Sequence, residues 1–367
     1  MIRILHMIGS LNIGGSQAMI MNLYRNIDRE KIQFDFILDH PDQLYFADEV
    51  KSLGGRIYFL PEFKGTNFFE VKKKWEMFFE EHPEYKVLHS HVRSYASIYL
   101  PIAKKHGLKT IIHSHSTSNG SGIKSYIKWL MQLPLRYQAD YFFGCSKEAG
   151  EWLFGEKVVN SDKYHMLQNA IDTKKYSFNE KIREQYRNAI GVGEHTLVFI
   201  HVGRLHEAKN HLYLLEVFSK YHSIHPDSIL VLVGDGDLRK EIEDKIEGLS
   251  INEAVKMLGA RNDVSNLLQA ADCFLFPSKW EGLPVTVVEA QAAGLPCLVS
   301  DAVTRDVNVS DLVENLPIDH GIDSWINAIE RMSFSKKDVT EDIVKAGFDI
   351  QSSAEWMENF YRGLVNE

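Results

Sequence analysis

The chain has 367 residues, of which 44% are hydrophobic and 25% are charged. These proportions are ordinary for globular proteins, and the length suggests two domains of about 100–200 residues each. No apolar run reaches the roughly 18 residues that a membrane span needs, and the N-terminal sequence lacks the layout of a signal peptide. We therefore expect a cytoplasmic protein whose three cysteines are reduced thiols rather than disulfide or metal ligands.

The net charge of −9 is unevenly distributed. Residues 1–168 carry 21 Lys and Arg against 18 Asp and Glu, whereas the rest of the chain carries 20 against 32. Within the first half, residues 101–150 hold seven basic and two acidic side chains. This asymmetry predicts different partners for the two halves.

Short apolar runs alternate with helical patterns along the whole chain, which predicts an α/β protein with parallel sheets covered on both faces. A boundary is expected near residues 167–172, before a polar stretch at 173–193, and apolar spacing predicts a last helix over 352–366. The predicted strands are 2–8, 32–38, 56–60, 86–90, 110–113 and 141–144, then 196–202, 228–233, 255–258, 272–276 and 297–300. The predicted helices are 16–27, 67–81, 94–106, 211–222, 238–247, 263–270 and 285–293.

Ligands of open parallel sheets bind beyond the carboxyl ends of the strands, so the motifs there come first. Gly14 and Gly15 follow the first predicted strand and open a helix. Paired glycines allow close approach of the backbone to an anion, and a helix N-terminus favours negative charge. By itself a glycine pair is weak evidence, and the full G-x-G-x-x-G fingerprint is missing.

Two His-x-His pairs follow the next strands: His89 with His91, and His113 with His115. Such pairs can bind metal, but no Asp, Glu or Cys at ligand spacing completes a site, so we expect none. For His113 we expect a plain role at a strand end, and His91 is a weak candidate for acceptor contact.

Residues 121–138 mix lysines and aromatic residues at helical spacing. Such a helix either touches anionic lipid at an interface or is partly buried with snorkelling lysines. The sequence leaves both interpretations open.

Arg204 and Lys209 follow Gly203, after the strand predicted at 196–202. Two fixed cations at the mouth of a sheet can neutralise a diphosphate and stabilise it as a leaving group. The alternative is a solvated loop with ordinary charges.

Asp235 and Asp237 form an Asp-x-Asp pattern, which is a signature for binding a metal with a nucleotide in one class of enzymes. We favour a structural reading, in which Gly236 makes a turn and Asp237 caps a helix that begins at Leu238.

Glu281 and Glu289 stand eight positions apart, with Gly282, Leu283 and Pro284 directly after the first. Proline is favoured at the start of a helix, so a helix is expected to open near Pro284 with Glu289 on its body. The helix N-terminus then lies between the two carboxylates and favours an anion. A ligand with an anionic middle between two hydroxylated rings, such as a nucleotide sugar, fits this pattern.

The segment 277–296 closely resembles the E-x7-E segment of retaining glycosyltransferases with two Rossmann-like domains facing a central cleft, the GT-B type. The resemblance implies that Glu289 holds the ribose, Glu281 holds sugar hydroxyls, and Arg204, Lys209 and N–H groups near Leu283 hold the diphosphate. It places His115 near the reacting carbon of the sugar. The remaining implied donor-binding residues are Gly14, Gly15, Gly203, Asp235, Arg261, Gly282 and Pro284.

The resemblance also implies an acceptor-binding domain at 1–168, a nucleotide-sugar domain at 169–348 and a C-terminal helix, 349–367, that crosses back to the first. The expected reaction moves a hexose from a nucleoside-diphosphate sugar, with UDP the expected nucleotide, to an acceptor hydroxyl without a metal cofactor. Bacterial enzymes that build capsular or exopolysaccharide have this layout. Their acceptors are often lipid-linked, which predicts peripheral contact with the inner face of the cell membrane. An epimerase of the same fold, a relative of glycogen phosphorylase and an inactive sugar-nucleotide-binding subunit remain alternatives.

Overall fold

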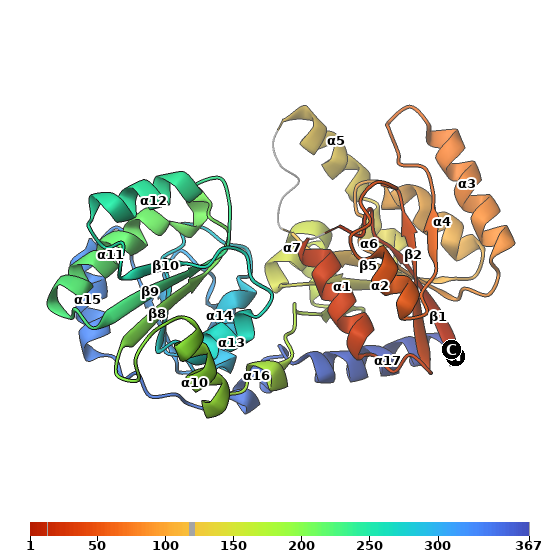
Figure 1. The fold of residues 1–367 in the computed structure, drawn as a ribbon. Coiled ribbons are helices and arrows are strands. Elements are labelled where there is room, and N and C mark those ends of the chain that lie inside the picture. Colours follow the sequence, from red (N-terminus) through yellow and green to blue (C-terminus); the bar gives the residue numbers. More distant parts are fainter. Residues whose placement is uncertain (13, 117–121, 367) are drawn as a thin grey trace. The chain divides into compact units, whose positions relative to one another are not determined.

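The computed structural model of the chain describes residues 1–12, 14–116 and 122–366, without the side chains of Ile123 and Lys124 (Figure 1). The chain forms two compact units, and each is described by itself. The first comprises Met1–Ala170 with Ile350–Glu367, and the second comprises Ile171–Asp349. The predicted fold class, α/β with two parallel sheets, is confirmed.

A seven-stranded parallel sheet forms the middle of the first unit, in the order β3-β2-β1-β4-β5-β6-β7. Its central strands are buried on both faces, because helices cover both. The strands are β1 (Ile2–Met7), β2 (Ile32–Leu38), β3 (Ile57–Phe59), β4 (Val87–Ser90), β5 (Lys109–Ser114), β6 (Tyr141–Gly144) and β7 (Tyr164–Met166).

Two hydrophobic clusters lie on the two faces of this sheet. One joins the strands to α1, α2 and the C-terminal helix α17, and the other joins them to α3, α4, α6 and α7. The segment expected as one helix over 121–138 is two helices, with Pro134 between them. The helices are α1 (Gly15–Asn26), α2 (Ala47–Ser52), α3 (Phe68–Glu81), α4 (Ala96–Lys105), α5 (Ile123–Gln132), α6 (Leu135–Gln138), α7 (Lys147–Phe154), α8 (Glu156–Val159) and α17 (Ile350–Asn366).

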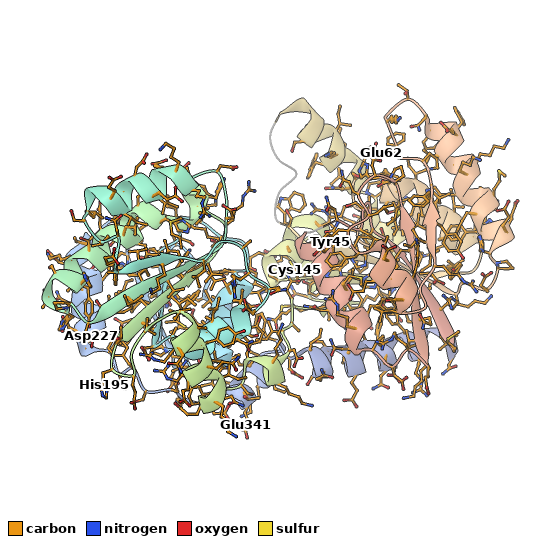
Figure 2. All side chains as sticks on the ribbon, in the orientation of Figure 1. Tyr45, Glu62, Cys145, His195, Asp227 and Glu341 are labelled. Carbon is orange, nitrogen blue, oxygen red and sulfur yellow. The ribbon has the colours of Figure 1, made fainter. Side chains whose placement is uncertain are left out.

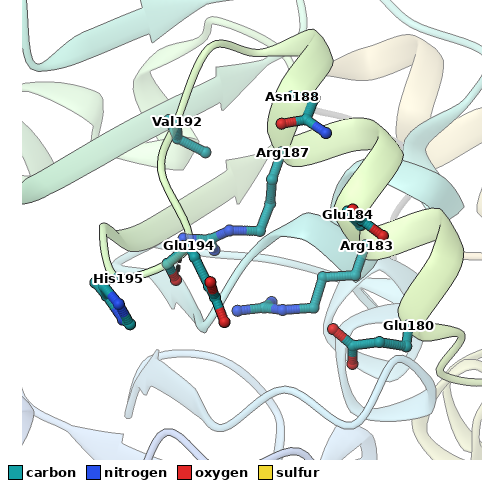
Figure 3. Close-up of a pocket in the computed structure, with 8 residues that line it drawn as sticks. All are labelled: Glu180, Arg183, Glu184, Arg187, Asn188, Val192, Glu194 and His195. Carbon is teal, nitrogen blue, oxygen red and sulfur yellow. Dashed lines mark hydrogen bonds between the residues drawn. The ribbon is translucent and has the colours of Figure 1, made fainter.

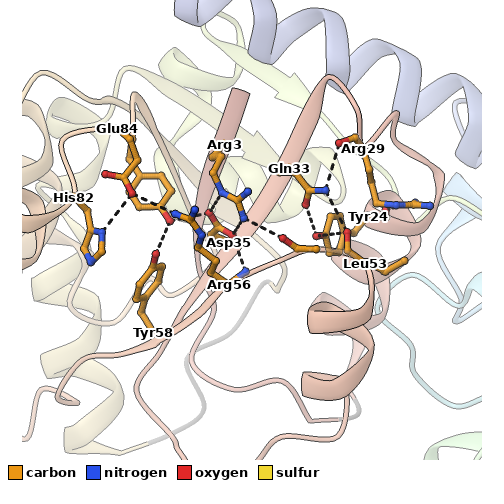
Figure 4. A network of polar contacts seen from close by, with 12 residues as sticks. Arg3, Tyr24, Arg29, Gln33, Asp35, Leu53, Arg56, Tyr58, His82 and Glu84 are labelled. Carbon is orange, nitrogen blue, oxygen red and sulfur yellow. Dashed lines mark hydrogen bonds and ion pairs between the residues drawn. The ribbon is translucent and has the colours of Figure 1, made fainter. Parts of the chain in front are cut away.

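Asp35 on β2 is a fully buried carboxylate whose role is structural (Figure 4). Arg3 reaches both of its oxygens at 2.5 Å, Tyr85 donates its hydroxyl at 2.7 Å, and the backbone N–H of Arg56 donates at 2.7 Å. A buried charge costs free energy unless it is paired and hydrogen-bonded, and Asp35 is both. Because its partners are all within the fold, we do not assign it to a ligand site.

The second unit is built on a six-stranded parallel sheet in the order β10-β9-β8-β11-β12-β13. Helices α11, α12 and α15 cover one face, and α13, α14 and α16 cover the other. The strands are β8 (Leu197–Val202), β9 (Ser228–Val233), β10 (Val255–Met257), β11 (Cys273–Phe276), β12 (Cys297–Ser300) and β13 (Val313–Leu316). The helices are α9 (Thr173–Tyr176), α10 (Glu180–Ala189), α11 (His211–Ile224), α12 (Arg239–Gly248), α13 (Val264–Ala270), α14 (Val285–Ala292), α15 (Ile322–Arg331) and α16 (Thr340–Lys345).

The polar stretch at 173–193 folds as part of the second unit. Arg187 of α10 is buried and donates to the carbonyls of Ala270 and Gly193, at 2.9 and 2.6 Å. It also contacts the carboxylate of Asp272 at 3.2 Å. These bonds fasten α10 to the segment that enters β11.

The three cysteines are free and buried, as expected. Cys145 follows β6 (Figure 2), and the other two begin β11 and β12. Burial raises the pKa of each thiol, which keeps the thiols protonated and unreactive. Within the described part of the chain, no helix is both long enough and apolar enough to cross a membrane.

Candidate functional site

The sheet of the second unit has a topological switch point between β8 and β11. The chain builds β8, β9 and β10 outward in one direction and then returns to add β11, β12 and β13 on the other side. In such sheets the two loops at the switch point leave a crevice at the carboxyl ends of the strands, where ligands bind. The loop after β8 carries Arg204 and Lys209, and the loop after β11 carries Glu281.

Two hydrogen bonds to backbone carbonyls hold these two loops against each other. The N–H of Lys279 donates to the carbonyl of Ala208 at 2.8 Å, and the side-chain amide of Asn210 donates to the carbonyl of Pro277 at 3.1 Å. Asn210 has a φ of 57°, a left-handed conformation that asparagine tolerates better than most residues. The turn that bears Lys209 is therefore fixed to the loop that bears Glu281.

Lys209 and Glu281 form an ion pair across the switch point. Lys209 Nζ and Glu281 Oε1 are 2.7 Å apart, and the two side chains are only 16% and 14% exposed. The contact does not have hydrogen-bond geometry, so Oε1 is left without a hydrogen-bond partner among the described residues. The ammonium also lies 4.7 Å from the ring centroid of Phe276 on β11. This places one cation and one anion side by side in a partly desolvated site, where charges interact strongly.

Glycines allow the neighbouring loops to approach closely. Gly234 has a φ of 142°, and a Cβ atom there would come within 1.9 Å of the carbonyl oxygen of Gly203. A Cβ atom on Gly236 would come within 2.4 Å of the carbonyl oxygen of Leu205. The predicted donor residue Gly203 thus lies where the β8 and β9 loops touch, with its N–H donated to Val233.

Arg204 lies on the exposed side of the same loop and pairs with Asp237 at 3.0 Å. The prediction that Asp237 caps the next helix is wrong: α12 begins at Arg239, and Asp237 instead turns toward the guanidinium of Arg204. Asp235 accepts from the N–H of Gly236 at 2.8 Å and lies 3.5 Å from Arg239. The two aspartates thus pair with different guanidinium groups.

Helix α14 begins after Pro284, as the sequence predicted, with Pro284 as the N-cap residue. Gly282 is exposed and nothing lies within 4 Å of a Cβ atom built on it, while Leu283 packs against the core. Among the described residues, Ser278 Oγ and Thr286 Oγ1 are buried without hydrogen-bond partners. Such groups are uncommon in folded proteins and can be satisfied by a ligand or by water. The sequence analysis did not single out Thr286.

Glu289 projects from α14 and accepts a hydrogen bond from the hydroxyl of Tyr176 at 2.6 Å. Burial raises the pKa of Glu289, while the bond from Tyr176 and the charge of Lys175 lower it in part. Tyr176 was not predicted from the sequence, because it lies in the polar stretch at 173–193 and no motif marks it. Tyr176 orients the carboxylate that is predicted to bind ribose.

Arg261 follows β10 and forms a bidentate pair with Asp263, at 2.8 and 2.6 Å. The hydroxyl of Tyr186 also donates to Asp263 at 3.0 Å. This pair keeps the guanidinium in a defined place beside the loops of β8 and β9, where Gly234 donates its N–H to the carbonyl of Gly259 at 2.8 Å.

The other predicted site residues belong to the first unit. Gly14 is the N-cap of α1 in an extended conformation, and Gly15 is the first helical residue. A Cβ atom on Gly14 would come within 2.5 Å of Gln17 Oε1, whereas Gly15 has open space. His115 follows β5, where it is partly exposed and 2.9 Å from a nitrogen of His91.

A separate hollow of about 620 Å³ lies beside α10 (Figure 3). Two arginines line it, but both are already paired with Asp272, and three glutamates surround them. An anion would therefore find no free cation there, and this hollow is not the candidate site. Its lining residues are Glu180, Arg183, Glu184, Arg187, Asn188, Val192, Glu194 and His195.

Comparisons with known proteins identify both halves of the chain. Residues 182–347 match the family "Glycosyl transferases group 1", and residues 13–175 match "Glycosyltransferase Family 4". EpsF of Bacillus subtilis (strain 168), whose name describes it as a glycosyltransferase, is 31% identical over 98% of this chain and 96% of its own length. An Escherichia coli protein named UDP-Gal:alpha-D-GlcNAc-diphosphoundecaprenol alpha-1,3-galactosyltransferase is 28% identical over 77% of this chain and 76% of its own.

Among solved structures, HepE of Anabaena in complex with UDP and glucose has a TM-score of 0.74 and 16% identity. The likeness covers 99% of this chain and 100% of that one, and it shows a common fold. The chain belongs to the glycosyltransferases and has the two parallel-sheet units of the GT-B type.

The raised pKa of Glu289 predicts that the charged carboxylate, which is proposed to bind the ligand, lowers the stability of the fold. A carboxyl group whose folded-state pKa exceeds its unfolded value stabilises the fold below the unfolded value, and this contribution is lost as pH rises through the folded pKa. Glu289→Gln should therefore gain thermal stability over the wild type as pH rises above about 4.5, the ordinary value for glutamate. The amide oxygen can still accept from Tyr176, so packing is retained.

The measurement is the thermal unfolding midpoint of both proteins across pH 4–8. Glu184→Gln, an exposed glutamate on α10, is the matched control and should follow the wild type at every pH. Parallel curves for Glu289→Gln and the wild type would show that Glu289 carries no such cost.

Proposed function

We propose that this glycosyltransferase moves a hexose from a UDP-linked sugar to an acceptor hydroxyl, with retention of anomeric configuration, during polysaccharide or glycolipid assembly. The observation that carries the proposal is the Lys209–Glu281 pair at the switch point, beside the N-terminus of α14. A cation and free helix N–H groups suit a diphosphate, and a carboxylate suits sugar hydroxyls.

The reaction follows from the charges in the site. The bond between the anomeric carbon and the diphosphate oxygen breaks, and the acceptor oxygen bonds to the same face of that carbon. The departing phosphate oxygen takes the acceptor proton. Negative charge thus grows on the diphosphate, where Lys209, Arg204 and the N–H groups of α14 would stabilise it.

The choice of UDP and of a lipid-linked or polysaccharide acceptor rests on relatives. The E. coli relative is named for UDP-Gal and for an acceptor on diphosphoundecaprenol, and HepE was crystallised with UDP and glucose. A relative from Staphylococcus aureus is named as a capsular polysaccharide biosynthesis glycosyltransferase. Asp235 and Arg261 lie in the loops that would meet the nucleotide base, and Glu289 would hold the ribose.

Replacing Arg204 or Lys209 by Ala should lower turnover by a factor on the order of 10²–10³, because each would stabilise charge that grows as the diphosphate leaves. The measurement is release of UDP from UDP-sugar, with and without acceptor. Arg204 is exposed, so its variant should keep the stability of the wild type. Lys209→Ala leaves Glu281 unpaired and should also lower the unfolding midpoint.

Arg239→Ala is the matched control, since Arg239 is also a partly exposed guanidinium that pairs with carboxylates near the same loops. It should retain turnover. A double variant of Arg204 and Lys209 with nearly normal activity would refute the assignment. Release of UDP that is much faster with acceptor than the slow hydrolysis without it would distinguish a transferase from an epimerase.

We propose that the reaction needs no divalent metal. Lys209, Arg204 and the N–H groups of α14 already oppose the diphosphate, and Asp235 and Asp237 pair with different arginines. Turnover should therefore survive treatment with a chelator followed by metal-free buffer. Loss of turnover that Mn²⁺ or Mg²⁺ restores would favour the Asp-x-Asp interpretation.

We further propose that α5 contacts an anionic membrane surface. Four of its apolar side chains are exposed, and Tyr126 stacks on Trp129 with ring centroids 5.7 Å apart. Surface potential contributes about 1 kcal/mol per basic residue close to anionic lipid, and residues 101–150 carry five net positive charges. The exposed fractions are 60% for Tyr126, 51% for Ile127, 42% for Trp129 and 45% for Leu130.

Co-sedimentation with liposomes tests this contact. Binding should require anionic lipid, weaken with salt and fall in a Lys124→Ala/Lys128→Ala variant. The side chain of Lys124 lies outside the described residues. A Trp129→Ala variant should also bind less, because it loses exposed aromatic surface. Lys240→Ala on α12, which removes an exposed charge from the second unit, should bind as the wild type does. Equal binding to neutral lipid, or none, would contradict the proposal.

A further inference from the structure

Five histidines gather at the carboxyl end of the sheet in the first unit. His6 lies on β1 directly beside His89 of β4, and His113 lies on β5 next in the sheet. His91 and His115 follow the last two of these strands. The sequence shows two of these pairs but gives no sign that His6 joins them, because His6 lies inside the first apolar strand.

Three of the five form a hydrogen-bonded chain. His6 Nδ1 lies 3.1 Å from His91 Nε2, and His91 Nδ1 lies 2.9 Å from His115 Nε2. The ring centroids are 5.4 and 5.1 Å apart, and the planes are inclined by only 18° and 29°. The facing nitrogens are close although the ring centres are far apart, so the rings meet edge to edge and do not lie face to face. Both nitrogens of His91 are therefore used within the chain.

The chain runs from the core toward the surface. His6 and His91 are buried, and His115 is partly exposed. Burial lowers the pKa of His6 and of His115 to about 3, with the charge of Arg93 adding to the effect on His115. Burial also lowers the pKa of His91. At neutral pH each ring is uncharged and carries a single N–H, so the chain has two possible directions.

The surroundings of His6 select one direction. Its Nε2 atom is buried without a hydrogen-bond partner among the described residues, and the rings of Phe34 and Phe36 lie 4.3 and 5.6 Å from its centroid. Buried N–H groups without a partner are rarer than buried acceptors without one. The proton of His6 therefore belongs on Nδ1, from which it is donated to His91. His91 in turn donates its Nδ1 proton to His115 Nε2.

We propose that His6 and His91 are positioning residues that fix His115 in the neutral form protonated on Nδ1. His115 then presents an N–H donor, and not a basic lone pair, at the edge of the sheet where ligands bind. In the reaction proposed above, on which this role rests, it donates a hydrogen bond to a ligand at this edge of the first unit's sheet and removes no proton. This agrees with a mechanism in which the phosphate oxygen takes the acceptor proton.

A metal ion is the competing explanation for the cluster. Nitrogens of His6, His89 and His91, and of His91, His113 and His115, lie within 4.8 Å of one another. Within the hydrogen-bonded chain of His6, His91 and His115, however, each acceptor lone pair points at the N–H of the neighbouring ring. The lone pairs therefore do not point toward one common position, as the ligands of a metal ion would. Bound metal would need these hydrogen bonds to be broken.

The test is the position of the proton on His115, read from the nitrogen chemical shifts of the full-length protein labelled with ¹⁵N-histidine. A His115→Phe variant assigns the signals. The wild type should show a protonated Nδ1 and an unprotonated Nε2 at neutral pH. The reverse pattern, or stoichiometric zinc in the purified protein by elemental analysis, would overturn the proposal.

Two variants test the role of His91. The carboxylate of His91→Asp can only accept, so a proton should appear on Nε2 of His115. In His91→Phe, which serves if the charged variant does not fold, the signals should move to the average of both tautomers. His113→Leu is the matched control. The ring of His113 stacks on that of His115, with centroids 4.0 Å apart, but neither nitrogen of His113 has a hydrogen-bond partner among the described residues, so the variant should leave the tautomer of His115 unchanged. Unchanged signals in both His91 variants would refute the inference.

These spectra need no sugar nucleotide, so the inference and the proposed function can fail separately. If His115 is protonated on Nδ1 but the protein cleaves no nucleotide sugar, the proposed function is refuted and the inference about the histidines stands. If the protein turns over a nucleotide sugar but His115 is protonated on Nε2, the inference is refuted and the proposed function stands.

Discussion

The ion pair between Lys209 and Glu281 is the contact on which the second unit's site depends. It joins the loops that follow β8 and β11, the two strands at the switch point of the sheet. Lys279 and Asn210 bind the same loops through backbone carbonyls, so the pair does not hold them alone. An ammonium has three donors, and the contact with Glu281 leaves others for phosphate oxygens. The carboxylate keeps an oxygen for hydroxyl groups. One contact thus sets both halves of the proposed nucleotide-sugar site before a ligand arrives.

Several residues around this pair lower the stability of the fold in a way that a bound ligand could offset. Glu289 is buried enough that its charge costs stability, and the bond from Tyr176 and the charge of Lys175 offset this cost only in part. Ser278 and Thr286 keep buried hydroxyl groups without partners among the described residues. Polar groups of this kind are tolerated where a ligand satisfies them, and functional sites often carry such local strain. The fully bonded Asp35 of the first unit shows the contrast, since its carboxylate serves only the fold.

The features of the fold and of the site that could be predicted are those that a short stretch of sequence determines. Strands such as β2, β6, β9 and β12 were predicted with their observed ends, because short apolar runs between turns mark buried parallel strands. The helix α10 within the polar stretch 173–193 was not predicted, because it is polar along most of its length and is fixed by contacts with distant segments, such as those of Arg187 and Arg183. The cap expected at Asp237 failed because Arg204, 33 positions away, competes for its carboxylate. Tyr176 and the chain from His6 to His115 depend on contacts between distant segments, which no local pattern contains.

The most direct test of the account is a panel of nucleoside-diphosphate sugars in metal-free buffer, with slow hydrolysis followed by NMR and the first anomer of the released sugar identified. The account predicts that one UDP-sugar is cleaved to UDP, that the free sugar first appears with the configuration it had in the donor, and that Glu281→Gln abolishes this while UDP still raises the unfolding midpoint. Release of the opposite anomer would contradict retention. If no nucleotide sugar is cleaved and no nucleoside diphosphate shifts the midpoint, the proposed donor site is wrong.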